Sequence, residues 1–115
     1  MLVAWTDPSR VSRLDGAVIG LGGDYAIAVN GHPRAVTGIV YLDAPDLARM
    51  AQSARGRNQV RAVILHELGH LVGLGHVPDR GAIMYPESLP GVWQFSAGDL
   101  RGLAAAGRDD CAHLR

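Results

Sequence analysis

Three histidines close together in the chain are the first residues whose spacing indicates chemistry. His66 and His70 are four residues apart, and His76 follows six residues later. Residues four apart share one face of an α-helix, so the first two imidazoles would point at one location, and zinc accepts imidazole nitrogen at about 2.0–2.1 Å. Glu67 is rotated from His66 by about 100° around the helix, where its carboxylate would lie beside the metal and hold a metal-bound water.

The third histidine requires the helix to end before it, because on a continuous helix His76 would point away from the shared face. Gly73 supplies this end, since glycine adopts positive φ freely and lets the chain turn back. A shell of three histidines with a fourth coordination position open to water is typical of a catalytic zinc site. The competing interpretation is a buried helix with satisfied core histidines, which fits poorly because three of the chain's five histidines fall into this pattern.

The elements that must position these residues indicate an α+β fold, with strands first and helices later. The asparagine–glycine turn at 30–31 predicts a hairpin between the second and third strands, and residues 17–23 predict a strand end followed by a loop. Asn58 is the expected N-cap of a helix that is buried because it is apolar nearly all round. The expected elements are strands over 2–6, 25–29 and 36–42, a helical turn or two over 45–52, a connection over 53–57, a helix over 59–72, an irregular segment over 75–95, a capping box over 96–99 and a helix over 100–106 closed by Gly107.

Size and composition favour one domain, residues 1–115, with a sheet part at 1–57, the histidine-bearing helix at 58–75 and the remainder at 76–115. Eleven basic residues balance eleven acidic ones, and the basic residues form no stripe, so neither nucleic acid nor a membrane surface is expected as a partner. The one cysteine, Cys111, excludes an internal disulfide and a thiolate-rich zinc site. No signal peptide is visible in residues 1–8, so the chain is either cytoplasmic or a trimmed form of a longer one.

The pattern His66-Glu67-x-x-His70-x-x-Gly73-x-x-His76 resembles the zinc signature of the metzincin metalloproteases. Ile83-Met84-Tyr85-Pro86 is similar to the methionine turn of that clan and is most like the matrixins. The resemblance implies a zincin-type fold, in which a small twisted mixed sheet packs on a buried active-site helix, followed by the irregular methionine turn and a short C-terminal helix. It implies a zinc metalloendopeptidase with Glu67 as general base and Met84 as an apolar floor under the imidazoles.

The resemblance also implies where a substrate would bind and what else the protein would hold. Residues 20–29 are similar to the glycine-rich loop and edge strand of matrixins, which pairs with a peptide or protein substrate in extended form. A secreted, extracellular location and structural calcium at Asp24 or Asp43 are further implications, whereas too few histidines remain for a second zinc. The substrate-binding residues implied in this way are Tyr25, Ala26, Ile27, Tyr85 and Pro86.

Two positions depart from the matrixin pattern. Val77 stands where matrixins usually have serine, and Ser88 stands where they usually have tyrosine, so the wall of the substrate pocket is not given by the resemblance. The family usually has a strand and a long helix before the part that residues 2–6 resemble. Two alternatives therefore stay open: an inactive zinc-binding domain or fragment, and a zinc amidohydrolase acting on a non-peptide amide. The sequence gives neither the cleavage specificity nor the oligomeric state.

Overall fold

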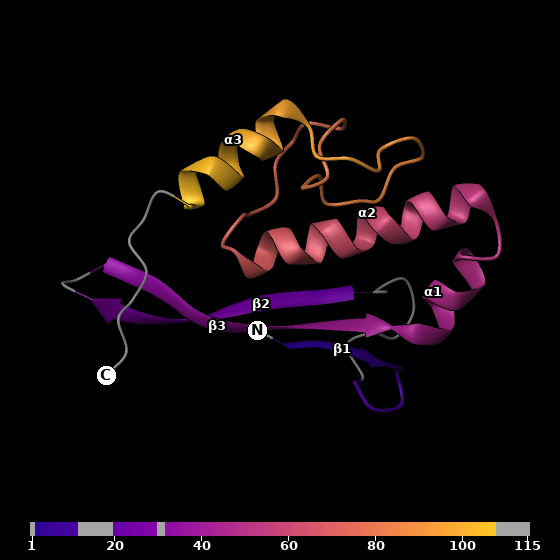
Figure 1. Ribbon diagram of the computed structural model, residues 1–115, viewed down its shortest axis with the longest axis horizontal. Helices are drawn as coiled ribbons and strands as arrows, with labels where there is room; N and C mark the ends of the chain where they lie inside the picture. The colour runs from indigo at the N-terminus through magenta and orange to yellow at the C-terminus, as the bar shows by residue number, and fades with distance from the viewer. Residues whose placement is uncertain (1, 12–19, 30–31, 108–115) are drawn as a thin grey trace.

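The computed structural model describes residues 2–11, 20–29 and 32–107 of the chain, and Figure 1 shows how its elements are arranged. Within these residues three strands precede three helices, so the predicted α+β class is confirmed. The elements in chain order are β1 (Leu2–Thr6), β2 (Gly20–Val29), β3 (His32–Asp43), α1 (Ala44–Met50), α2 (Ala54–Leu71) and α3 (Ala97–Ala106).

The described strands form a mixed sheet of order β1-β3-β2. β1 runs parallel to β3, whereas β2 runs antiparallel to it and forms the predicted hairpin, with Val29 opposite His32. The Asn30-Gly31 turn itself lies outside the described residues. Because β2 is at the end of the strand order, one of its edges is covered by no other described strand.

The beginning of β2 differs from the prediction of a loop in the glycine-rich residues. Gly20 already pairs opposite Leu42, and Gly23 pairs opposite Ile39. Pairing with an inner strand that is itself buried supplies the backbone hydrogen bonds, and this outweighs the low strand preference of glycine. The absence of a side chain matters at Gly20, because a Cβ there would lie 2.9 Å from Cγ of Glu67.

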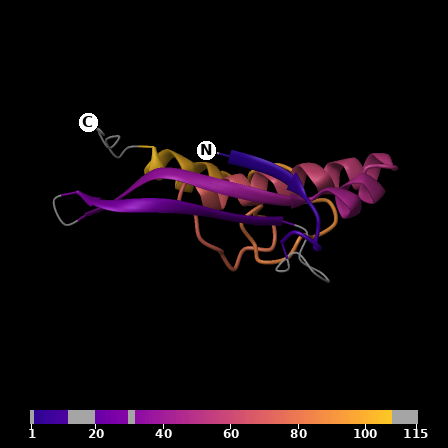
Figure 2. The ribbon, with the colours of Figure 1, turned by 90° about the horizontal axis from the view of Figure 1, so that it is seen from below.

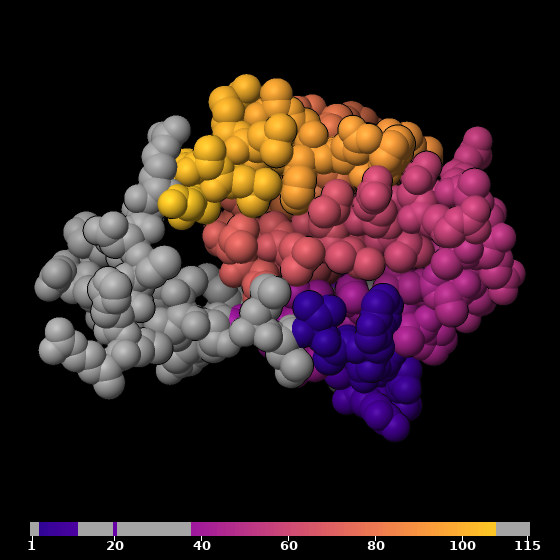
Figure 3. Space-filling view, viewed as in Figure 1, coloured from indigo at the N-terminus to yellow at the C-terminus, as the bar shows by residue number. Residues whose placement is uncertain are grey.

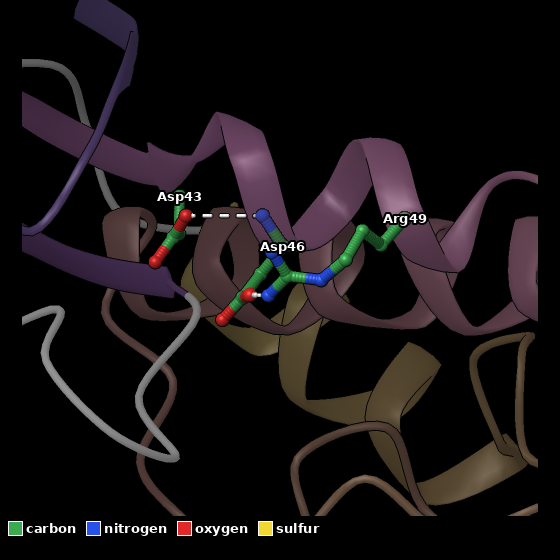
Figure 4. Close-up of polar contacts among 3 residues, drawn as sticks. All are labelled: Asp43, Asp46 and Arg49. Atoms are coloured by element: carbon green, nitrogen blue, oxygen red, sulfur yellow. Dashed lines mark hydrogen bonds and ion pairs between the residues drawn. The ribbon is translucent and has the colours of Figure 1, made fainter.

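Helix α1 begins directly where β3 ends, and Figure 4 shows the contacts that start it. The carboxylate of Asp43 accepts a hydrogen bond from the Asp46 backbone nitrogen at 3.2 Å, which is the standard contact of an N-cap. Pro45 lies in the first turn, where its missing N–H costs no helical hydrogen bond. The side chain of Asp46 pairs with Arg49 one turn later.

The start of α2 corrects the prediction, because the helix begins at Ala54 with Ser53 as its N-cap. Both Asn58 as the N-cap and residues 53–57 as a connection are therefore wrong. The Ser53 hydroxyl accepts a hydrogen bond from the Gly56 backbone nitrogen at 2.9 Å. Gly56 is not a helix break but a point of close approach, since a Cβ there would lie 1.5 Å from the carbonyl oxygen of Met50.

Helix α2 lies between the sheet and the segment that follows it, and α3 lies on the side of α2 away from the sheet (Figures 1 and 2). In the space-filling view α2 appears as a band between β1, in indigo, and that later segment (Figure 3). Among the described residues, no helix is long and apolar enough to cross a membrane. Helix α3 starts with the predicted capping box, formed by Ser96 and Asp99, and ends at Gly107.

Two apolar clusters cover α2 on different faces, and they account for its buried residues, which lie between Ala62 and Leu71, whereas residues 54–58 are mostly exposed. The sheet-side cluster joins α2 to β3 and α1, and the turn-side cluster joins α2 to the segment after it. The sheet-side cluster consists of Val40, Leu42, Leu47, Val63 and Leu71. The turn-side cluster consists of Ala62, Ile83 and Met84, with Leu65, Leu74, Val92, Trp93 and Phe95 packed against it.

Candidate metal centre

The C-terminal end of α2 turns the chain back toward the helix. Gly73 has a φ of 98°, a conformation that glycine adopts without steric cost. Its N–H donates to the His70 carbonyl at 3.0 Å, and the N–H of Leu74 donates to the Gly69 carbonyl at 2.9 Å. These two bonds form a Schellman motif, so the last carbonyls of α2 are satisfied at the point where the chain leaves toward His76.

The three histidines are brought together by this turn. The distance between Nε2 of His66 and Nε2 of His70 is 3.1 Å. Nε2 of His76 lies 3.1 Å from that of His70 and 3.2 Å from that of His66. His66 and His70 are half-buried and His76 is exposed, so the triangle of nitrogens opens toward the surface.

Two of the rings are fixed by hydrogen bonds at their other nitrogen. Nδ1 of His66 donates to the carbonyl of Ile83 at 2.6 Å, and Nδ1 of His70 donates to the carbonyl of Leu74 at 2.8 Å. A carbonyl can only accept, so in the neutral rings the proton is on Nδ1 and Nε2 carries a lone pair. Two of the three Nε2 atoms therefore present lone pairs to the space between the rings, and the third lies at the same distance, an arrangement suited to a cation between them.

The donor set and the distances fit a divalent metal ion. Within the described part of the chain, these histidines form the one group of three or more potential ligand side chains that the structure places together. Tetrahedral zinc with bonds of about 2.0–2.1 Å would hold its ligand nitrogens about 3.3 Å apart, close to the separations found here. The arrangement could therefore hold a metal with three neutral imidazoles.

The electrostatics of the site favour these neutral imidazoles. Burial lowers the pKa of His66 below its usual value, against the smaller opposing effect of the hydrogen bond to Ile83. The pKa of His76 is lowered first by desolvation beside the other rings and then by repulsion from His70 and His66. A metal binds the deprotonated imidazole, so both shifts act in favour of metal binding near neutral pH.

Glu67 belongs to α2, and its side chain packs against Gly20, the first residue of β2. Its side chain is buried, with 8% of its surface exposed, and its Oε1 would be 3.2 Å from a Cβ placed on Gly20. Its charge raises the pKa of His76, which opposes the lowering by the neighbouring rings. The carboxylate is thus held between α2 and the sheet, close enough to act electrostatically on the third histidine.

Met84 lies against the helix between the two histidines that α2 carries. Its side chain is 1% exposed, and its sulfur would lie 2.4 Å from a Cβ placed on Gly69, so only glycine lets the thioether approach the backbone here. The carbonyl of Met84 accepts a hydrogen bond from the N–H of Val77 at 3.0 Å. This bond ties the residue after His76 to Met84, whose role as a floor under the rings stays a prediction.

Asp99 is a residue of this region whose contacts beyond α3 the sequence does not indicate. Its carboxylate accepts hydrogen bonds from the backbone nitrogens of Ile83 at 2.7 Å and Met84 at 3.4 Å, besides its capping contact at the start of α3. The capping pattern identifies Asp99 as a helix-start residue. Nothing in the spacing relates it to a turn 15 residues earlier, so only the folded structure shows this contact.

The residues expected to bind substrate lie in two places. Tyr25, Ala26 and Ile27 belong to β2, where they pair with β3 across an irregularity in the register between Tyr25 and Ala26. Tyr85 is half-buried, and its hydroxyl accepts a hydrogen bond from Arg80 at 3.1 Å while the guanidinium lies 5.4 Å from the ring centre. Pro86 is exposed. Their roles in substrate binding stay predictions.

The two positions that depart from the pattern, and the calcium candidates, also have defined places. Val77 is exposed, and Ser88 donates a hydrogen bond to the side chain of Gln59 at 2.6 Å, which anchors the segment after Pro86 to α2. Asp43 caps α1, as described above, and the side chain of Asp24 lies outside the described residues. Structural calcium stays a prediction.

A mixed sheet beside a helix that carries two of three convergent histidines defines an α+β domain with a candidate three-histidine metal centre. Comparison with known proteins gives the family. The sequence pattern of the matrixin family, Peptidase M10, matches residues 8–105. Because that match covers most of the chain, the chain belongs to the matrixin family, as the resemblance of its motifs implied.

Individual relatives agree with this assignment. The chain is 39% identical to an interstitial collagenase of Aquarana catesbeiana over 83 residues, which are 72% of this chain and 21% of that protein. It is 38% identical to an interstitial collagenase of Sus scrofa over 87 residues, which are 75% of this chain and 18% of that protein. It is 55% identical to metalloendoproteinase 1 of Glycine max over 31 residues, which are 27% of this chain and 10% of that protein. The chain thus spans about a fifth or less of these relatives, and no solved structure matches.

Proposed function

We propose that this chain is the catalytic centre of a zinc-dependent metalloendopeptidase, with His66, His70 and His76 as the metal ligands and Glu67 as the general base. The observation that carries the proposal is the triangle of Nε2 atoms, 3.1–3.2 Å apart, with Nδ1 of two rings donating to backbone carbonyls. Three neutral imidazoles suit zinc better than ions that prefer oxygen ligands. Membership of the matrixin family agrees with this choice.

When bound, zinc would supply a Lewis acid and a water of lowered pKa at the open coordination position. Glu67 would accept a proton from the attacking water as its oxygen bonds to the carbonyl carbon of the substrate. The same carboxylate would then return the proton to the leaving amine as the C–N bond breaks, so atoms and charge balance. Its burial between α2 and Gly20 keeps the carboxylate in one place for both transfers.

The substrate would be a peptide or protein segment in extended form along the free edge of β2. The support for this is that β2 ends the strand order among the described residues and carries Tyr25, Ala26 and Ile27. Strand addition gives affinity through backbone hydrogen bonds and is tolerant of sequence. Tyr85 and Pro86, which follow Met84, would line the other side of the site. An extracellular location is part of the proposal and is supported by the interstitial collagenases among the relatives.

The decisive experiment compares the two glutamates of the chain. Glu67→Ala should retain one zinc per chain, because the three histidines are intact, and should lose about 10²–10⁴-fold of its peptide-cleavage rate, the usual contribution of a general base. Glu87→Ala is the matched control, since Glu87 is exposed in the segment after Met84 and should leave the rate unchanged. Cleavage of a broad peptide library is followed by mass spectrometry, and zinc by metal analysis.

The outcomes separate the proposal from its alternatives. One zinc per chain with no cleavage of any peptide by the unaltered protein would make it an inactive zinc-binding domain. Zinc-dependent hydrolysis restricted to non-peptide amides would make it an amidohydrolase. Full activity in Glu67→Ala would remove Glu67 as the base and leave the metal assignment standing.

A further inference from the structure

Asp99 connects the C-terminal helix to the candidate metal centre. It is 4% exposed and lies in the first turn of α3. Its Oδ2 accepts from the backbone nitrogens of Ser96 at 2.9 Å and Ile83 at 2.7 Å. Its Oδ1 accepts from the backbone nitrogen of Met84 at 3.4 Å. Only the Ser96 contact belongs to the capping box, so the other two hold the segment that carries Ile83 and Met84.

The peptide group between Ile83 and Met84 joins this carboxylate to a histidine ring. Its N–H, which belongs to Met84, donates to Asp99, and its carbonyl, which belongs to Ile83, accepts from Nδ1 of His66 at 2.6 Å. Hydrogen bonds in such a chain polarise one another, so a negative charge at one end strengthens the acceptor at the other. The N–H of Ile83 also donates to Asp99, so the carboxylate holds this residue from both sides.

We propose that Asp99 is a positioning residue of the metal centre, which orients the His66 ring and increases its basicity through the Ile83–Met84 peptide. Metal-binding histidines commonly donate their second nitrogen to a carboxylate or carbonyl that sets ring orientation and ligand strength. Here the Ile83 carbonyl contacts the His66 ring directly, and the Asp99 carboxylate acts on that carbonyl through the Ile83–Met84 peptide. The inference rests on the proposed function only in requiring that the histidines bind a metal, not that the protein cleaves peptides.

His70 provides an internal reference for this connection. Its Nδ1 donates to the carbonyl of Leu74, which belongs to the turn after α2 and not to the segment that Asp99 holds. A change at Asp99 that acts through the Ile83–Met84 peptide should therefore affect His66 and leave His70 unchanged. A change that only loosened the fold would affect both rings.

The first test compares Asp99→Asn with Ser96→Ala. Asparagine keeps the size of Asp99 but removes its charge and replaces one accepting oxygen with a donor. Ser96→Ala removes the hydroxyl that accepts from the Asp99 backbone nitrogen and leaves the carboxylate contacts in place. Zinc affinity, measured by competition with a chromophoric chelator, should fall about 10–100-fold in Asp99→Asn, as expected for loss of an outer hydrogen-bond partner. It should stay unchanged in Ser96→Ala.

The second test uses the zinc-loaded unaltered protein, so it does not depend on the folding of a variant. The Nδ1 proton of His66 should resonate downfield of that of His70, because its hydrogen bond is shorter and ends on a peptide that a charged group polarises. In Asp99→Asn only the His66 resonance should move upfield. The reverse order of the two resonances in the unaltered protein would overturn the proposal.

Other results would also overturn it. Equal zinc affinity in Asp99→Asn and the unaltered protein would remove the positioning role, and an equal loss in Ser96→Ala would reduce Asp99 to a helix cap. Both outcomes leave the proposed function standing. A protein that binds no zinc at all would instead remove the proposed function and this inference together, so the two failures are distinguishable.

Discussion

The second half of α2 is covered on two faces, yet the two faces are built from different chemistry. The sheet-side cluster has a core of valine and leucine side chains and joins three elements by apolar contact. The turn-side cluster is tied by hydrogen bonds to a metal-ligand candidate and a buried carboxylate: Ile83 accepts from the His66 ring, and Ile83 and Met84 donate to Asp99. We infer that one face of the helix mainly stabilises the fold, while the other positions the candidate metal ligands. Substitutions on the first face should therefore lower the free energy of unfolding, and substitutions on the second should lower zinc affinity.

The interactions on the two sides of α2 also differ in kind. On the sheet side, burial of apolar area stabilises the fold without directional requirements. On the turn side, three backbone carbonyls, those of Leu74, Ile83 and Met84, accept hydrogen bonds that fix the rings of His70 and His66 and the residue after His76. Directional bonds of this kind set position more than stability.

The largest effect on stability is expected from Leu42→Ala on the sheet side. Leu42 is fully buried, and removing a buried leucine side chain lowers the free energy of unfolding by about 2–5 kcal/mol. Zinc affinity of the folded protein should stay unchanged, because the turn-side hydrogen bonds are intact. Chemical denaturation and zinc competition measure the two quantities. Leu100→Ala is the control, since that side chain is 55% exposed and its removal should change neither.

Gly69→Ala tests the turn side. Alanine in place of helical glycine gains about 1 kcal/mol of helix propensity, but its Cβ would lie 2.4 Å from the Met84 sulfur, and such overpacking costs about 1–3 kcal/mol. We expect a net loss of up to about 2 kcal/mol, accompanied by weaker zinc binding because Met84 must move and its neighbour Ile83 accepts the hydrogen bond from His66. Calorimetric unfolding and zinc competition measure the two losses.

Gly98→Ala is the matched control for that substitution. Its Cβ would meet no atom closer than 3.6 Å, so an alanine there should fit within α3 without moving a neighbour. If Gly69→Ala lowered the free energy of unfolding but left zinc affinity intact, the assignment of the turn side to ligand positioning would be wrong.

The sequence predicts the convergence of the three histidines better than it predicts the start of the helix that carries two of them. His66, Glu67, His70, Gly73 and His76 lie within eleven consecutive positions, so helix geometry and one turn are enough to bring the rings together. The start of α2 could not be predicted in this way. Ser53 and Asn58 are both acceptable N-caps, and what decides between them is the close packing of Gly56 on Met50, which is a tertiary contact.

The contacts of Asp99 are a second example of tertiary interactions that the sequence does not predict. The capping-box pattern with Ser96 is local and predictable, whereas its contacts to Ile83 and Met84 join segments about 15 residues apart through backbone groups. Backbone donors leave no trace in residue types, so no spacing rule finds them. The strand at Gly20 escapes prediction for a related reason, because pairing with β3 overrides the loop preference of glycine.

Gly73→Ala should have a smaller effect on zinc affinity than Gly69→Ala. The residue has a φ of 98°, where an L-residue costs about 1 kcal/mol, and no atom lies within 4 Å of the added Cβ. The free energy of unfolding should fall by that amount, and zinc affinity should fall slightly because the carbonyl of Leu74 loses its fixed position. Gly75→Ala is the matched control, since it meets no atom within 4 Å and does not have positive φ. Equal melting temperatures of the two variants would contradict the predicted strain.

The smallest expected effect is the pH dependence of the metal-free protein, and it belongs to the turn side alone. The folded pKa values of His66 and His76 are lowered, His66 mainly by burial and His76 by desolvation and the neighbouring rings. An unfolded histidine titrates near its ordinary value of about 6.5, so below that pH the unfolded state binds more protons than the folded state. The melting temperature should therefore fall as the pH drops from about 7 through about 6.5 and below. His66→Gln should flatten this dependence, whereas Leu42→Ala should lower the whole curve without changing its slope. A slope unaffected by the loss of His66 would show that the histidine triangle is not where the protons bind.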